Sequence, residues 1–194
     1  PAGRQYQWFI DTPRGHPGAA ALRVDPARMD LLFSVLQALA DTGVQVVGFL
    51  HPVHAYNEEA MFAVGRATDY HAFRAAMAER FAALSGDPIA SCAPGGQGVL
   101  WDFAGFQQVA TTALPEPGAT AAHPTHHEPA HYTPQTGVRL LERMLSGTES
   151  GEFGVILTPR SLPSSAREID ARRAAYLQSE DGERLSALVA RYGD

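Results

Sequence analysis

The chain has one cysteine, no run of basic residues and no apolar run long enough to cross a bilayer. The single Cys92 excludes a framework of internal disulfides. A formal charge of −6 without a basic run does not suit a surface that must neutralise nucleic-acid phosphates. A spanning helix needs about 20 mostly apolar residues, so we expect no membrane span, and the first residues do not resemble a signal peptide. We therefore expect a globular protein that binds no nucleic acid.

The organisation predicts a single α/β domain over residues 1–194, which is long enough to bury a sizeable core. The strand candidates are short apolar runs, at residues 6–10, 44–50, 99–103 and 153–157. The helix candidates follow capping residues or acids, and start at Pro26, Asn57, Asp69 and Pro134, with a helical tail after about residue 170. Residues 113–130 read as a long loop. This alternation favours an α/β sandwich with a mainly parallel sheet.

Polar residues follow several of the predicted strands. In sheets of this kind the functional crevice lies beyond the carboxyl ends of the strands. His51 and His54 follow one strand, Asp102 ends another, and Glu128 with His131 precedes a helix. The topology can bring all five to one edge of the sheet, where His51, His54 and Asp102 are candidates for substrate contact.

The segment at 128–137, EPAHYTPQTG, contains the strongest sign of chemistry. It places Glu128 three residues before His131, directly ahead of a helix that Thr133 can cap. A carboxylate in this position can fix the tautomer of an imidazole and stabilise the imidazolium, while the other ring nitrogen moves a proton. The spacing favours His131 as a general base and Glu128 as the residue that orients it.

Several blocks also resemble, in order, a bacterial family of SGNH-hydrolase-like proteins. These blocks are FLHPVHA at 49–55, LWDFAGF at 100–106, EPAHY at 128–132 and FGVILTP at 153–159. The block HYTPQTG at 131–137 is similar to the C-terminal catalytic block of the alginate O-acetyltransferase-type members. The resemblance implies a flavodoxin-like, three-layer α/β/α sandwich. It also implies ester hydrolysis or acetyl transfer on a carbohydrate or small ester, without a cofactor, in the bacterial periplasm or cell envelope.

Two features depart from the family pattern. The acid is Glu128 where the family usually has aspartate, and no Gly-Asp-Ser block supplies a nucleophile. The nearest counterpart is Phe9-Ile10-Asp11-Thr12, in which Thr12 would replace serine. Three alternatives stay open: Thr12 is the nucleophile, the nucleophile block lies upstream of this chain, or the domain is non-catalytic and binds a glycan or a partner.

A histidine-rich stretch suggests a rival reading as a metal site. Four histidines and one acid crowd into it: His123, His126, His127, Glu128 and His131. Imidazole and carboxylate are good zinc ligands. However, Pro124 and Pro129 prevent a continuous helix that would align two ligands one turn apart. We therefore expect no catalytic metal, with a histidine-rich metal-binding protein as the alternative.

Overall fold

The computed structural model describes residues 25–63, 65–84, 98–113, 123–146 and 153–193. The helices in these ranges are α2 (Pro26–Asp41), α3 (Ala55–Ala63), α4 (Ala67–Ala83), α5 (Pro134–Ser146), α6 (Leu162–Leu177) and α7 (Glu180–Gly193). The strands are β1 (Val47–Leu50), β2 (Val99–Asp102), β3 (His126–Glu128), β4 (His131–Tyr132) and β5 (Val155–Ile156). The strand predicted at 6–10 lies outside the described residues.

The central sheet has the order β1-β2-β5. β1 and β2 run parallel, with Val47 opposite Val99, whereas β5 runs antiparallel to β2. The α/β class is confirmed, but the described sheet is small and mixed rather than mainly parallel. The apolar run at 153–157 indicates a buried strand, and burial alone carries no information about strand direction.

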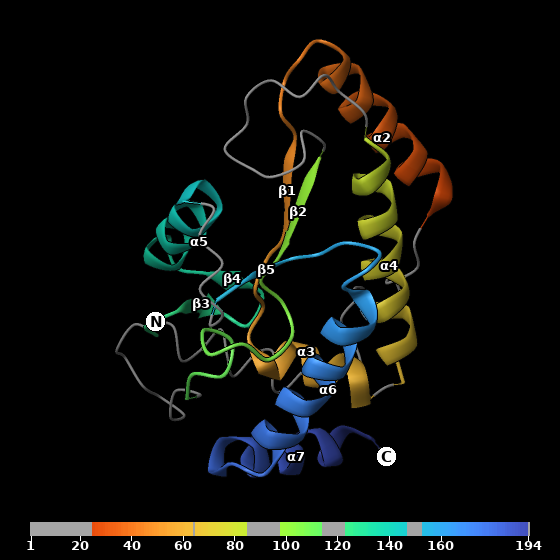
Figure 1. The fold of residues 1–194 in the computed structure, drawn as a ribbon. Coiled ribbons are helices and arrows are strands. Elements are labelled where there is room, and N and C mark those ends of the chain that lie inside the picture. The colour runs from red at the N-terminus through yellow and green to blue at the C-terminus, as the bar shows by residue number, and fades with distance from the viewer. Residues whose placement is uncertain (1–24, 64, 85–97, 114–122, 147–152, 194) are drawn as a thin grey trace.

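Helices lie on both faces of this sheet (Figure 1). On one face Phe33 of α2 and Phe81 of α4 pack edge to face, with their ring centroids 5.3 Å apart, in a core that also holds Leu100. On the other face α5 places Leu140 against Trp101 and Phe103. Leu100 and Trp101 therefore point to opposite faces, as successive strand residues must.

A glycine in β1 lets α4 approach the sheet. A Cβ at Gly48 would collide with the ring of Phe81, so a larger residue here would push α4 away from the strand. A second core lies beyond the carboxyl ends of β1 and β2, where α3, α6 and α7 gather (Figure 1). None of the described helices combines the length and the apolarity that crossing a membrane requires.

The helix starts follow the predicted caps in two of four cases. Asp25 accepts the N–H groups of Ala27 (3.0 Å) and Arg28 (3.3 Å), and Thr133 Oγ1 accepts Thr136 N–H (3.4 Å), as the sequence predicts. The prediction of Asn57 as an N-cap is wrong, because α3 already begins at Ala55.

His54 takes the capping position of α3 instead. Its Nδ1 accepts Tyr56 N–H (3.1 Å) and its carbonyl accepts Asn57 N–H (2.8 Å). The helix predicted from Asp69 starts two residues earlier, at Ala67. The prediction of 113–130 as loop is also wrong at its end, where β3 pairs with β4 in a small antiparallel hairpin.

Candidate functional site

The β3–β4 hairpin holds the Glu128–His131 pair. Glu128 lies opposite His131 in the hairpin, and its carboxylate is fixed at both oxygens. Oε2 accepts the N–H of Ala130 at 2.8 Å, and Oε1 contacts Nδ1 of His131. The glutamate side chain is only 12% exposed whereas the histidine side chain is 81% exposed. The hairpin therefore orients an imidazole through Nδ1 and leaves Nε2 on the open side of the ring.

His51 follows β1 and approaches the same hairpin. Its ring centroid lies 6.3 Å from that of Tyr132, and the residue is exposed. Partial burial of the ring, and then the nearby imidazole of His131, lower the pKa of His51. At neutral pH, His51 is therefore an uncharged hydrogen-bonding group beside the Glu128–His131 pair. Of the predicted substrate-contacting residues, it has the most open position.

His54, the other histidine of the HPVH turn, is fully buried. Its Nε2 lies 2.8 Å from the Thr112 carbonyl, and its Nδ1 accepts the Tyr56 N–H. These contacts fix the neutral tautomer with the proton on Nε2, and burial lowers the pKa to about 3. The geometry supports a structural role, and substrate contact by His54 stays a prediction that this placement does not favour.

His54 belongs to a cluster of three imidazoles with His123 and His126. The ring centroids are 5.5 Å (His54 to His123), 5.5 Å (His54 to His126) and 6.1 Å (His123 to His126) apart. His123 Nδ1 accepts the N–H of His126 (3.1 Å), and its Nε2 lies 2.9 Å from the Ala113 carbonyl. Two of the three rings thus use both nitrogens on the backbone, which leaves no lone pair directed at a metal.

The third ring differs in one respect. Nδ1 of His126 lies 2.9 Å from Thr125 Oγ1, whereas its buried Nε2 has no hydrogen-bond partner of good geometry within the described part of the chain. Burial lowers the pKa of His126 to about 4, although the Pro52 carbonyl acts in the opposite direction. Across the described ranges, no group of three or more histidine, cysteine, aspartate or glutamate side chains could hold a metal ion.

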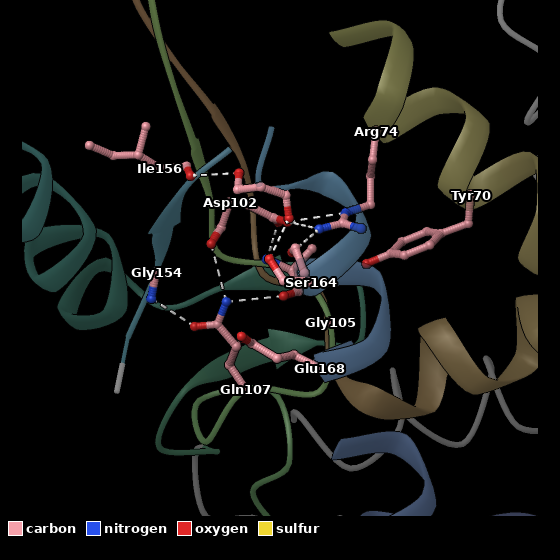
Figure 2. A network of polar contacts seen from close by, with 12 residues as sticks. Tyr70, Arg74, Asp102, Gly105, Gln107, Gly154, Ile156, Ser164 and Glu168 are labelled. Carbon is pink, nitrogen blue, oxygen red and sulfur yellow. Dashed lines mark hydrogen bonds and ion pairs between the residues drawn. The ribbon is translucent and has the colours of Figure 1, made fainter. Parts of the chain in front are cut away.

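Asp102 ends β2, and its side chain points toward Arg74 in a buried network (Figure 2). It accepts hydrogen bonds from Nε (3.0 Å) and Nη2 of Arg74, and Nη2 also donates to Ser165 Oγ (2.6 Å). Both charged side chains are 1% exposed. Substrate contact by Asp102 remains a prediction, and its burial and pairing with Arg74 favour a structural role.

Glu58 extends this network, and sequence reasoning missed it. Its carboxylate accepts the N–H groups of Gly105 (2.8 Å) and Phe106 (2.9 Å), and Tyr70 donates its hydroxyl at 3.3 Å. Burial raises the pKa of Glu58 to about 7, although these hydrogen bonds act to lower it. Gly105 and Phe106 adopt φ values of 89° and 55°, which turn both N–H groups toward the acid. Gly105, three residues after the end of β2, is the sequence signal for this turn.

Comparison of the chain with known protein families, characterised proteins and solved structures gives no significant match. The assignment of chemistry therefore rests on the site itself. Thr12, the predicted nucleophile, lies outside the described residues. Glu128 is the sole hydrogen-bond partner of the His131 ring among the residues that the structure describes.

Proposed function

We propose that the chain is an SGNH-like ester hydrolase or O-acyl transferase acting on a carbohydrate or small ester. The observation that carries this proposal is the exposed imidazole of His131, held through Nδ1 by a carboxylate that the Ala130 N–H fixes in turn. The resemblance of the ordered blocks supports the same class. The proposal also includes what this resemblance implies: a flavodoxin-like sandwich with a mainly parallel sheet, and a location in the bacterial cell envelope.

The mechanism assigns one proton transfer to each step. Nε2 of His131 removes the proton of a hydroxyl nucleophile as its oxygen attacks the acyl carbon of the ester. Glu128 stabilises the resulting imidazolium, which then returns the proton to the departing alcohol and leaves an acyl-enzyme. Water or a sugar hydroxyl, deprotonated in the same way, attacks that intermediate and regenerates the free enzyme. Neutral His51 can donate a hydrogen bond to the bound substrate.

A fluorophosphonate probe tests the assignment of His131. An activated hydroxyl displaces fluoride from the probe, and intact-mass analysis detects the single adduct. We expect an adduct on the wild type and on His127→Ala, which removes an exposed histidine of the same hairpin. We expect none on His131→Ala. Equal labelling of all three proteins would show that His131 does not activate the nucleophile.

Glu128→Gln tests the orienting carboxylate. The amide keeps the size of the side chain but removes the charge that stabilises the imidazolium, so we expect labelling to slow by at least about tenfold. Glu142→Gln is the matched control, because it alters an exposed glutamate on α5. Labelling of Glu128→Gln at the wild-type rate would remove this residue from the mechanism.

One observation favours a second candidate, a non-catalytic domain that binds a glycan or a protein. No hydroxyl among the described residues hydrogen-bonds to the His131 ring, whereas a binding domain needs no such hydroxyl. Absence of a probe adduct on the wild type, together with unchanged glycan binding by His131→Ala, would favour this candidate over the enzyme.

A further inference from the structure

One peptide group in the turn of the β3–β4 hairpin forms hydrogen bonds on both of its sides. The carbonyl of Pro129 accepts the backbone N–H of His54 at 2.8 Å. The N–H of Ala130, in the same peptide plane, donates to Glu128 Oε2 at 2.8 Å. Because a trans peptide is planar, its C=O and N–H point in opposite directions and cannot turn independently. His54 and Glu128 therefore hold the two sides of one rigid unit.

The carboxylate of Glu128 depends on this peptide for its orientation. A glutamate side chain has much rotamer freedom, which is lost only when its oxygens are fixed. Here the N–H of Ala130 holds one oxygen while the other contacts Nδ1 of His131. A rotation of the peptide would turn that N–H away and release the carboxylate from the imidazole. The direction of the peptide thus sets the direction of the His131 ring.

On the carbonyl side, the peptide is held by the N-cap residue of α3. Nδ1 of His54 accepts Tyr56 N–H at 3.1 Å, and its carbonyl accepts Asn57 N–H at 2.8 Å. An N-cap residue keeps a non-helical backbone conformation that these bonds maintain. Its own N–H takes no part in the helix and donates to Pro129 instead. The cap therefore sets the direction in which His54 meets the hairpin.

The ring of His54 is held at its other nitrogen as well. Nε2 lies 2.8 Å from the Thr112 carbonyl, and the residue is fully buried. Because burial lowers the pKa of His54 to about 3, the ring is neutral at pH 7 and keeps both contacts. The ring of His126, with its centroid 5.5 Å away, packs against it. His54 is thus a fixed point from which the hairpin turn is oriented.

We propose that His54 is a positioning residue of the candidate site, which acts on His131 through the Pro129–Ala130 peptide and Glu128. Hydrogen bonds that follow one another in this way polarise and strengthen each other. A histidine that lies within the core therefore influences an imidazole on the surface without touching it. The positioning rests on these contacts alone, and only its effect on catalysis rests on the proposed function.

The tautomer of His131 is the direct readout. The Glu128 carboxylate accepts a proton from Nδ1, which leaves the lone pair on Nε2. An imidazole without a fixed acceptor populates both tautomers. The ¹⁵N chemical shifts of the ring nitrogens distinguish the two forms in NMR spectra at about pH 9, where an ordinary imidazole is neutral. This measurement needs neither a substrate nor a nucleophile.

Three substitutions of His54 test the link. His54→Ala removes both ring contacts, and we expect the fraction of His131 protonated on Nδ1 to fall at least about twofold. His54→Asn places an oxygen near the position of Nδ1, and asparagine is a favoured N-cap, so this variant should keep most of the wild-type fraction. His54→Gln also keeps an amide, but its longer side chain does not suit the cap, so we expect a loss like that of His54→Ala.

Leu185→Ala is the control for a general loss of stability. Leu185 of α7 is fully buried in the core that α3 shares, so its truncation leaves a cavity but removes no member of the hydrogen-bonded chain. We expect the wild-type tautomer of His131 in this variant. An equal change of tautomer in Leu185→Ala and His54→Ala would show that the effect is general, and would overturn the positioning role.

Two further results would overturn it. The first is a His131 tautomer that stays as in the wild type in His54→Ala and His54→Gln, and the second is a loss in His54→Asn as large as that in His54→Ala. Should the alanine and glutamine variants not fold, the scalar coupling across the His54 N–H to Pro129 C=O hydrogen bond tests the wild type. Its absence would remove the link.

Fluorophosphonate labelling separates this role from the proposed function. We expect labelling of His54→Ala to slow together with the loss of the Nδ1-protonated form, and His54→Asn to recover both. If the tautomer of His131 responds as expected but the wild type forms no adduct, the positioning by His54 stands and only the proposed enzyme fails.

Discussion

Two acid–base pairs of this protein differ mainly in their exposure to water. Arg74 and Asp102 are 1% exposed, and the described structure satisfies them with Ser165 and the Ala104 N–H. In the Glu128–His131 pair the histidine side chain is 81% exposed. A buried charge that loses its partner has no water to replace it, whereas an exposed imidazole can exchange protons with whatever binds there. Burial thus suits the first pair to stability and exposure suits the second to chemistry.

Breaking the buried pair should have the largest effect. Arg74→Met keeps much of the side-chain volume but leaves the Asp102 carboxylate buried without its cation. We expect the free energy of unfolding to fall by about 3–5 kcal/mol, measured by urea denaturation at pH 7.

Arg80→Met is the matched control for that experiment. Arg80 also joins two elements through an aspartate, Asp30 of α2, but its side chain is 44% exposed. The loss there should stay below about 1 kcal/mol. Equal losses in the two variants would show that burial does not separate the two kinds of pair.

Glu58 sharpens the comparison through pH. Its pKa lies near 7 in the folded protein, against 4.5 for a free glutamate, so the folded state holds the proton more tightly. The associated stability is fully present below about pH 4.5 and is lost as the pH rises through 7. Relative to Glu58→Gln, wild-type stability should decline by about 3 kcal/mol across this window, as followed by thermal or urea denaturation at several pH values.

Comparing wild type and Glu58→Gln at each pH isolates the contribution of the Glu58 carboxyl to the pH dependence of stability. His54 and His126, whose pKa values are lowered by burial, give stability that rises with pH, and they are present in both proteins. Glu142→Gln alters an exposed glutamate on α5, and its free energy of unfolding should follow that of the wild type at every pH. If the difference in the free energy of unfolding between wild type and Glu58→Gln does not change with pH, Glu58 does not titrate in this range.

The sequence predicted the parts of the fold that depend on local patterns. The Asp25 cap and the apolar runs that become β1 and β2 are readable because capping and burial act on neighbouring residues. Strand direction at β5 depends on contacts between distant segments, and nothing local in 153–157 encodes it. The β3–β4 hairpin was hidden by the histidines and prolines that suggested a loop.

In the candidate site, too, the sequence predicted a contact between near neighbours and missed contacts between distant segments. Glu128 and His131 are three residues apart, so their spacing alone predicted the contact that the hairpin makes. His51 and His54 have almost the same sequence context, yet one is exposed and the other caps α3 from within the core. What distinguishes them is the packing of the 123–126 segment against His54 and the contact of its Nε2 with the Thr112 carbonyl. The partner of Asp102 is 28 residues away, beyond the reach of any spacing rule.

The exposed pair should give the smallest effect on stability. His131→Ala removes a side chain that is 81% exposed, so little buried apolar surface is lost, although the buried Glu128 carboxylate loses one of its two partners. We expect the free energy of unfolding to change by less than about 1 kcal/mol in urea denaturation, in the same preparation that fails to label with the fluorophosphonate. The Ala130 N–H still holds Glu128 after the change, which keeps the hairpin satisfied. A loss as large as that of Arg74→Met would instead make the Glu128–His131 pair part of the core, and the missing label would then report unfolding rather than chemistry.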